Sequence, residues 1–350
     1  MQTGRPTFLR LLADACRADR LPLAICGMFI LASLMLLASK GINGFDPVSV
    51  VLNAQLLLTC LVFWVALWFT WALWKARPDS PIQFARQFAA ANLNAAIIAR
   101  QLPVLIALCV YMPVFSAMKA SISLFADYDW DTTFMRWDAL IHFGDAWRLI
   151  HPVAGYPVIT FILNLFYNLW IVVIYAATLF LALRMRSPVL RQRFLFSYFL
   201  CWSLIGVAGA ISLASVGPAF FSPLLGQHHF DPLMQYLADA DTHYRILSVE
   251  VQAKLVTEFR EGFRGLGAGI TAMPSMHVSM TFLFFLAFRH VSRIATWLSG
   301  IFCLLILIGS VHLAFHYAVD GYVSIIATAL IWIAGRKLYG HDSYAAKDCD

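Results

Sequence analysis

Long apolar stretches, most of them long enough to cross a lipid bilayer, recur along this chain. Of its 350 residues, 61% are hydrophobic and 13% are charged, whereas a soluble domain is about 45–50% apolar and about 25% charged. A helix needs roughly 20 apolar residues to span the hydrocarbon core. The sequence therefore predicts an all-α integral membrane protein with about eight transmembrane helices. We place these spans at 22–39, 49–74, 97–118, 157–183, 195–216, 276–290, 295–312 and 317–335.

The first apolar stretch follows a polar segment, Met1 to Arg20, that carries several arginines. No convincing small-residue cleavage site follows it, so we interpret the stretch as a retained span rather than a removed signal peptide. The net charge of +6 is typical of basic cytoplasmic loops in a membrane protein. No zinc finger or basic helix is evident in the sequence, and we expect no nucleic-acid partner.

The basic residues divide unevenly between the two sides that eight spans would create. With a cytoplasmic N-terminus, 17 of the 25 Lys and Arg residues lie inside: Arg5, Arg10, Arg17, Arg20, Lys75, Arg77, Arg86, Arg100, Arg184, Arg186, Arg191, Arg193, Arg289, Arg293, Arg336, Lys337 and Lys347. The eight outside are Lys40, Lys119, Arg136, Arg148, Arg245, Lys254, Arg260 and Arg264. Because Lys and Arg are enriched in cytoplasmic loops, this distribution predicts that both termini lie inside. The polar segments 119–156, 217–275 and 312–317 are then outside.

The outer end of the sixth predicted span carries the motif Pro274-Ser275-Met276-His277. Proline and serine are typical of a helix start, where the first backbone N–H groups lack intrahelical partners. Together with the Ser275 hydroxyl, these amides would form an anion site that the helix dipole favours. A plain serine-capped helix start is the simpler interpretation of Pro-Ser alone, but an ionisable histidine at a membrane edge favours a functional site.

A second motif, His312 to Asp320, reaches the same outer face between the seventh and eighth spans. His312, His316 and Asp320 are spaced i, i+4, i+8, so they share a face if the segment is helical. Asp320 could then accept a hydrogen bond from one ring nitrogen of His316 and leave the other free to attack phosphorus. His312 and His316 could instead bind a metal ion, but the sequence offers no clear third ligand.

Two further patterns are weak. Asp127, Asp129 and Asp131, with Asp138 further on, are spaced like ligands of a calcium loop, but Thr132 stands where that loop needs glycine. The glycines at 265, 267 and 269 follow no predicted strand and lack a Gly-Lys-Ser/Thr ending, which argues against a nucleotide loop. We expect them to give flexibility beside the anion site.

Pro-Ser-Met-His, followed at a distance by His-Tyr-x-x-Asp at His316 to Asp320, resembles the second and third signature motifs of the type-2 phosphatidic acid phosphatase superfamily. The flanks, Gly269 to Ser279 and His312 to Tyr322, are most similar to its branch containing inositol phosphorylceramide synthase. The stretches 138–147 and 167–170 also resemble bacterial members of that branch. The resemblance extends over roughly 120–335. It implies a phosphatidic acid phosphatase-like catalytic membrane domain at 119–340, after an N-terminal part with three spans at 1–118 and before a cytoplasmic tail at 341–350.

The resemblance also implies roles for individual residues. His316 would be the nucleophile, Asp320 its orienting partner and His277 the general acid, while Ser275 would bind phosphate. The family has no obligatory metal, so we expect neither a metal site nor a cofactor.

This sequence departs from the superfamily pattern at its cationic positions. The first motif, a lysine followed by Arg-Pro, is not recognisable, and 217–221 (Gly-Pro-Ala-Phe-Phe) stands as its possible replacement. Ser310 occupies the position of the arginine six residues before the nucleophile. Because cationic stabilisation of the transition state is a large effect, another group must replace these charges. Arg264 is the first candidate for phosphate binding, followed by Arg136 and Arg148.

The leading hypothesis is a membrane phosphotransferase that acts on a lipid-linked phosphate at the outer face through a phosphohistidine. Its partners would be a phosphate-bearing membrane lipid and an acceptor, either a lipid alcohol or a polyol. A lipid phosphate phosphatase is the alternative, and a non-catalytic scaffold or a transporter is the alternative from another class. The compact loops favour a bacterial inner membrane with the site facing the periplasm.

Overall fold

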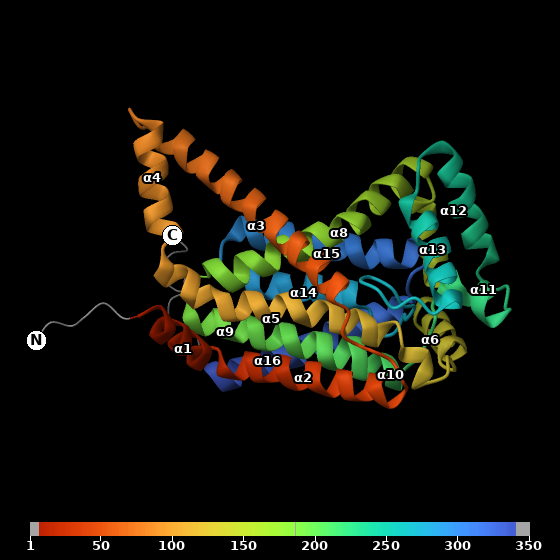
Figure 1. Ribbon diagram of the computed structural model, residues 1–350. Helices are drawn as coiled ribbons and strands as arrows, with labels where there is room; N and C mark the ends of the chain where they lie inside the picture. Colours follow the sequence, from red (N-terminus) through yellow and green to blue (C-terminus); the bar gives the residue numbers. More distant parts are fainter. Residues whose placement is uncertain (1–6, 186, 341–350) are drawn as a thin grey trace, which may run out of the picture.

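The computed structural model describes residues 7–185 and 187–340, and within these ranges its regular secondary structure is entirely helical. Arg5, Arg186 and Lys347, which were counted among the inside basic residues, and the predicted tail at 341–350 lie outside the described residues. Figure 1 shows a bundle of long helices with shorter helices gathered at one end. We describe the helices in three groups: an N-terminal group, a central bundle and an outer cap.

The N-terminal group precedes the first short helices of the cap. It consists of α1 (Phe8–Ala18), α2 (Arg20–Ser39), α3 (Pro47–Ala76), α4 (Pro81–Asn92) and α5 (Ala95–Lys119). Helix α3 begins at a strong start signal, because the Asp46 side chain accepts hydrogen bonds from the backbone N–H groups of Val48 and Ser49. In Figure 1, α3 slopes away from the rest of the bundle toward α4.

The central bundle contains the other long helices. They are α8 (Pro157–Arg184), α9 (Pro188–Leu200) with its continuation through the π-helix η2 (Cys201–Gly209) and α10 (Ala210–Ser212), α14 (Met276–Phe288), α15 (Arg293–His312) and α16 (Ala318–Tyr339). Serine caps begin three of them, since Ser187, Ser275 and Ser292 each accept a hydrogen bond from a backbone N–H in the first turn.

The outer cap is formed by short helices from the two predicted outer segments. These are η1 (Ile122–Leu124), α6 (Asp131–His142), α7 (Ala146–Ala154), η3 (Pro218–Phe220), α11 (Phe221–Leu225), α12 (Asp231–His243) and α13 (Leu247–Glu261). We predicted these segments only as polar loops. Some of their apolar residues, among them Phe134, Leu233 and Leu237, are fully buried, so hydrophobic burial folds these helices onto the end of the bundle.

Within the described residues, seven helices are long and apolar enough to cross a membrane. The predicted spans agree with them within four residues, except that the fifth helix begins at Pro188 rather than at 195. The sixth predicted span, 276–290, corresponds to α14, which at 13 residues is shorter than these seven helices. At 1.5 Å per residue it rises about 20 Å, against about 30 Å for the 20 residues of α15. The first residues of α14 therefore lie deeper in the bundle than the last residues of α15.

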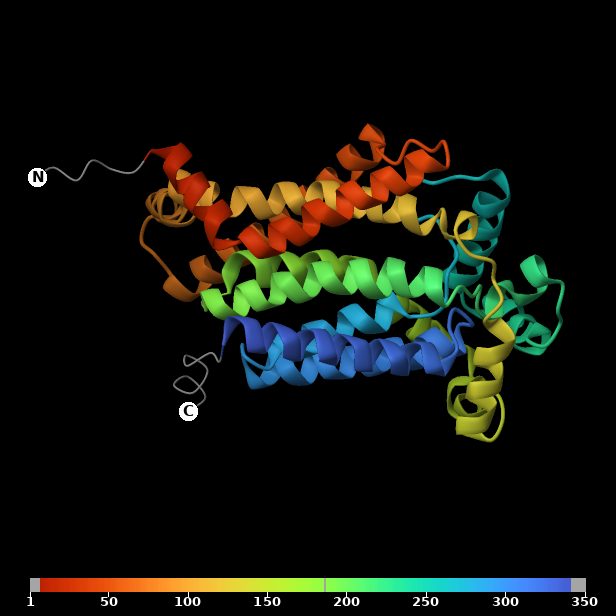
Figure 2. The same cartoon turned by 90° about the horizontal axis from the view of Figure 1, so that it is seen from below.

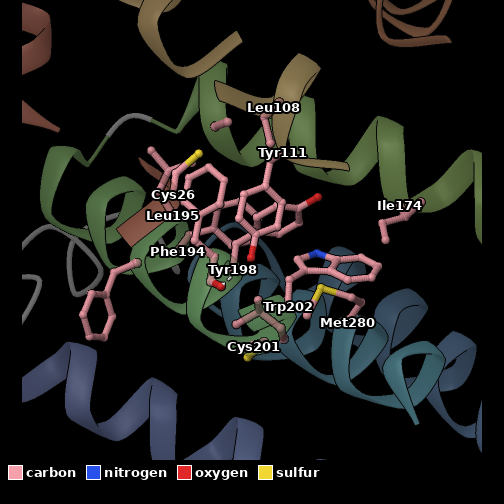
Figure 3. Packing of buried hydrophobic residues seen from close by; sticks show 14 of the residues in the cluster. Cys26, Leu108, Tyr111, Ile174, Phe194, Leu195, Tyr198, Cys201, Trp202 and Met280 are labelled. Carbon is pink, nitrogen blue, oxygen red and sulfur yellow. Dashed lines mark hydrogen bonds between the residues drawn. The ribbon is translucent and has the colours of Figure 1, made fainter. Parts of the chain in front are cut away.

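Aromatic side chains join the N-terminal group to the central bundle. Tyr111 of α5 donates a hydrogen bond from its hydroxyl to the carbonyl oxygen of Phe199 at 3.1 Å. Figure 3 shows Tyr111, Tyr198 and Trp202 close together in this core. Helix α5 is consequently buried on the side that faces α9 and η2, although it belongs to the first group.

Figure 2 shows that α1 and the end of α16 lie at the end of the bundle opposite the cap. The turn between α8 and α9 and the turn between α14 and α15 lie at that same end. These segments carry many of the basic residues that were assigned to the inside, including Arg17, Arg191 and Arg293.

Candidate active site

The segment between α15 and α16 folds back toward the bundle instead of continuing as a helix. Helix α15 ends at His312, and the backbone N–H groups of Phe315 and His316 both donate to the carbonyl oxygen of Ser310 at 3.0 Å. Helix α16 then begins at Ala318. The condition for a shared helical face is therefore not met, and His312 points into different surroundings from His316 and Asp320.

His316 and Asp320 form the buried pair that the motif predicted. His316 Nδ1 lies 3.2 Å from Asp320 Oδ2, and the two side chains are 6% and 0% exposed. The same carboxylate oxygen accepts a hydrogen bond from the Tyr317 backbone N–H at 3.0 Å. A proton on Nδ1 would donate to Asp320, and Nε2 makes no hydrogen bond to any described residue. This arrangement favours the tautomer in which the lone pair of Nε2 is free.

His277 lies in the first turn of α14, with its ring centroid 6.0 Å from that of His316. Two aromatic rings of α8 hold it. Tyr167 stacks on the imidazole with a centroid distance of 4.7 Å, and Trp170 lies at 4.1 Å. Because α14 starts deeper in the bundle than the point where α15 ends, His277 lies beside the turn between α15 and α16 that contains His316, and not beside the cap.

Ser275 is fully buried and caps α14, since its hydroxyl accepts a hydrogen bond from the Val278 backbone N–H at 3.4 Å. The N–H groups of Met276 and His277 have no acceptor among the residues that the structure describes. Both residues line the same cavity as His316. Free amides at a helix start favour an anion.

Two aspartates of α6 stabilise the backbone around this site by accepting hydrogen bonds from its N–H groups. Asp138 accepts hydrogen bonds from the N–H groups of Ala318 and Val319 at 2.8 and 2.9 Å, so it caps the start of α16. Asp131 accepts from the N–H groups of Val216 and Gly217, both at 2.9 Å, and from the Tyr317 hydroxyl. Burial raises the pKa of each aspartate, and the hydrogen bonds from the backbone oppose that shift. These two residues of the calcium-like pattern bind backbone groups.

Gly217 holds the His316 turn in place from the other side. Its φ of +92° is unfavourable for any residue with a side chain, and a Cβ there would lie 2.6 Å from the Phe315 carbonyl oxygen. Two residues later, the Ala219 N–H donates to the carbonyl oxygen of Ala314 at 2.8 Å. The segment that stood as a replacement for the first motif therefore contributes close packing to the site.

The three arginines that we expected near phosphate do not line the cavity that contains His277 and His316. Arg264 donates to the Ser121 hydroxyl at 3.1 Å and to the Gly262 carbonyl oxygen at 2.9 Å. Arg148 pairs with Asp145 at 3.0 Å and covers the Trp147 ring. Arg136 is exposed on α6. Among the described residues, the Lys or Arg side chain that does line the cavity is Lys119, the last residue of α5.

The cavity has a volume of about 500 Å³ and lies between the N-terminal group, the central bundle and the cap. His277, His316 and Lys119 are on its wall, together with many apolar and aromatic side chains from α5, α8 and η2. Pockets of this size, mostly apolar with a few convergent polar groups, are typical ligand sites.

His312 belongs to a separate polar cluster. Its Nε2 lies 2.9 Å from Thr160 Oγ1, which also lies 2.6 Å from the Tyr236 hydroxyl oxygen. Its ring centroid is 6.0 Å from that of His151. Within the described part of the chain, no group of three or more His, Cys, Asp or Glu residues is placed to hold a metal ion, and His312 and His316 do not face one another as a metal pair.

Sequence reasoning missed Lys119, Tyr167 and Trp170 as residues of this site. Lys119 was counted only as an outer basic residue, and its position at the end of an apolar span was the available signal. The stretch 167–170 entered only through the family resemblance, and nothing in its spacing indicates that its aromatic rings would pack on His277.

Comparison with known proteins agrees with this geometry. A family model described as the PAP2 superfamily matches residues 132–334, which is more than half of the chain. No curated protein and no solved structure matches the chain significantly. The match includes both histidine motifs and all of α6 except its first residue, Asp131, and it leaves α1 to α5 outside. The chain belongs to the PAP2 superfamily.

Proposed function

We propose that this protein is a membrane phosphotransferase that takes a phosphate-bearing group from a lipid and passes it to an alcohol through a phosphohistidine on His316. Membership of the PAP2 superfamily supports phosphatase- or phosphotransferase-type activity in general. The observation that carries the proposal is the pairing of His316 with Asp320 at 3.2 Å, with His277 on the wall of the same cavity.

In the first step, His316 Nε2 attacks the phosphorus of the donor lipid and the bond from phosphorus to the leaving oxygen breaks. His277 donates a proton to that oxygen, so an alcohol leaves and a phosphohistidine remains. Asp320 stabilises the positive charge that develops on the ring of His316. Reacting atoms in a productive complex are about 3–3.5 Å apart. The 6.0 Å between the two ring centroids supports a phosphoryl group between the histidines.

In the second step, the acceptor hydroxyl attacks phosphorus, His277 takes its proton, and Nε2 of His316 leaves. Water and an alcohol are chemically equivalent here, so the choice depends on access. His316 is 5% exposed, and the cavity wall around it is mainly apolar and aromatic. Limited water access favours transfer to a lipid alcohol or polyol over hydrolysis. Hydrolysis by a lipid phosphate phosphatase is the alternative within the same chemistry.

For the phosphate itself, we propose that the free amides at the start of α14 bind its oxygens, with Ser275 holding that turn in shape. Arg264 remains a candidate from the sequence. It would act from the loop at 262–271, which also contributes Leu266 and Gly267 to the cavity wall.

We further propose that the cap and the site face the outside of a bacterial inner membrane. The grouping of basic residues at the opposite end of the bundle supports this orientation. A scaffold with inactive motifs would need none of this geometry, and the buried histidine–aspartate pair argues against it, because buried ionisable groups are costly and cluster at functional sites.

The test uses the purified full-length protein in detergent without divalent metal, with a panel of labelled phospholipids as donors. Acceptors are diacylglycerol, ceramide and inositol, each compared with water alone. Labelled product on an added acceptor, faster than release of free phosphate, is the expected result. Release of free phosphate that no acceptor diverts would instead assign the protein as a phosphatase. If no donor is turned over and His316→Ala equals the wild type, the enzymatic proposal fails.

A further inference from the structure

The cavity extends from the histidines far into the membrane-spanning part of the bundle. Along α8 its wall runs from Tyr167, which stacks on His277, to Thr178. Along α5 it runs from Lys119 to Leu108. Each stretch advances eleven residues, which corresponds to about 16 Å at 1.5 Å per residue. Two independent helices therefore give the same depth for this part of the cavity, which we call the arm.

A depth of about 16 Å matches one leaflet, since the hydrocarbon core of a bilayer is about 30 Å thick. The wall of the arm is mostly apolar, with Leu57 from α3, Leu108 and Met112 from α5, and Ile174 from α8. Near its deep end, the Tyr175 hydroxyl donates to Asn53 Oδ1 at 2.7 Å, and this bond ties α8 to α3. The arm thus has the length and the surface of a site for one hydrocarbon chain.

The arm also meets the lipid-facing surface of the bundle. Leu56 of α3 and Ile171 of α8 line the cavity, yet they are 42% and 50% exposed. In the membrane these side chains face hydrocarbon, so a chain could pass from the bilayer into the arm between α3 and α8 without crossing water. In Figure 1, α3 and α8 cross near the middle of the bundle and diverge beyond the crossing.

The opposite end of the cavity is rich in hydrogen-bond donors without partners. The Tyr167 hydroxyl, the Trp170 Nε1 and the Thr271 hydroxyl are buried and make no hydrogen bond to any described residue, and all three residues are on the cavity wall. Lys119 lies there as well; Glu258 of α13 interacts with it electrostatically, but no carboxylate oxygen of the described residues is within 4.0 Å of its ammonium group. Buried polar groups normally find partners, and phosphate oxygens would satisfy all four.

We propose that the helices preceding the PAP2 region complete the substrate site. Helix α5 supplies Lys119 as the cation for the phosphate of the lipid, and α3, α5 and α8 together form an arm that takes one of its hydrocarbon chains. The superfamily pattern has positive charges in its first motif, for which 217–221 stands here, and at position 310, which is a serine here. Lys119 supplies a positive charge in their place. The role of Lys119 in turnover rests on the proposed function, but binding of the chain does not require turnover.

The experiment measures binding of non-hydrolysable alkyl phosphonates with butyl, octyl, dodecyl and hexadecyl chains to the full-length protein in detergent. Dissociation constants are referred to the free aqueous ligand. In the wild type, each methylene buried in the arm should tighten binding about 4-fold, and the gain should level off once the chain fills the arm. Lys119→Met should weaken binding of every chain length by the same factor, roughly 10- to 100-fold.

Matched variants locate the chain. Ile174→Trp fills the arm, whereas Val172→Trp places the same bulk on a side chain of α8 that is 51% exposed and off the cavity wall. The first should make affinity level off at a shorter chain, and the second should behave like the wild type. If Ile174→Trp does not fold, Leu57→Phe and its exposed control Leu58→Phe make the same comparison on α3.

Affinity that is independent of chain length in the wild type, or equal for the arm-filling and control variants, overturns the proposal. If Lys119→Met binds every ligand as tightly as the wild type does, the proposed role of Lys119 as the cation for the phosphate is overturned. Chain-dependent binding with no turnover of any donor supports the proposal while the proposed function fails. Turnover without chain-dependent binding would support the proposed function and overturn the proposed site for the chain. The two failures are therefore distinguishable.

Discussion

Helix α3 and the continuous helix from α9 to α10 are both apolar spans, but they contribute to the protein in different ways. In the most apolar window of α3 only 11% of residues are buried within the protein, against 67% from Pro188 to Ser212. The central helix is fixed by packing over most of its surface, whereas α3 faces lipid along most of its length. This contrast separates a central helix that is held within the protein from a helix before the PAP2 region that is open to the bilayer.

The difference teaches where each requirement of the reaction is met. The proposed catalytic groups need fixed distances, and the PAP2 region provides them through buried hydrogen bonds such as those of Asp138 to the start of α16. The proposed lipid substrate needs access from the membrane, which a helix that is mostly buried within the protein does not give. We therefore expect substitutions in the PAP2 region to affect the chemical step and those in α3 and α5 to affect substrate binding.

The largest effect is expected for His316→Gln in the PAP2 region. Loss of the nucleophile should lower kcat by roughly 10⁴-fold or more and abolish the phosphoenzyme, because no covalent intermediate can form. Turnover of a labelled donor and acid-labile label on the protein measure the two effects. His312→Gln is the matched control, since His312 hydrogen-bonds to Thr160 in a separate cluster. Equal losses in both variants would show that the assignment of the nucleophile is wrong.

Lys119→Met in α5 should reduce kcat/KM by roughly 10²- to 10³-fold, because a cation that stabilises the transferring phosphate would be lost. Lys119→Arg should retain part of this activity, since it keeps the charge but not its position. Arg264→Met is the comparison, and it should cost less because Arg264 is engaged with Ser121 and Gly262. A larger loss at Arg264 than at Lys119 would return the phosphate-binding role to the loop at 262–271.

Asp138→Asn should lower both stability and kcat. An amide offers one acceptor oxygen for the two N–H groups that the carboxylate now binds, and loss of one charged hydrogen bond costs about 1.5–3 kcal/mol. Thermal unfolding in detergent measures the first effect and donor turnover the second. The exposed Asp14, which pairs with Arg17 on α1, provides the control. Asp14→Asn should leave the midpoint unchanged, because exposed ion pairs contribute little.

The smallest effect is expected for Asn53→Leu on α3. Asn53 donates to the carbonyl oxygens of Leu108 and Cys109 and accepts from Tyr175, so it ties α3 to α5 and α8 at the deep end of the arm. Hydrogen bonds between membrane helices contribute about 0.6 kcal/mol each. We expect a small loss of stability and a broader preference for chain length in the phosphonate assay. Thr70→Val, elsewhere on α3, should change neither property. An unaltered chain preference in Asn53→Leu would show that the hydrogen bonds of Asn53 do not shape the arm.

Most of the membrane-embedded fold could be predicted from the sequence. Seven spans follow from runs of apolar residues, since length and hydrophobicity alone decide whether a helix crosses a bilayer. The histidine motifs and the pair of His316 with Asp320 were also predictable, because they lie four residues apart in one local segment. The superfamily is shown by the family match, whereas the inositol phosphorylceramide synthase-like branch stays a prediction.

The cap was not predictable in the same way. Its helices, such as α6 and α12, are short and of mixed polarity, so their helical state depends on burial of side chains such as Phe134 and Leu237 against the bundle. The shared face of His312 and His316 was inferred on the condition of a helix, and the backbone turn at Ser310 breaks that condition.

The sequence by itself determined that this protein lies in a membrane, which segments cross it, and which two motifs carry the ionisable groups of the site. These properties are local, because they depend on runs of neighbouring residues. Only the tertiary structure decided that Lys119, Tyr167 and Trp170 meet His277 and His316 around one cavity, and that Asp138 fastens α16. The packing of helices brings together residues that are 107 to 197 positions apart, and no local pattern encodes such a distance.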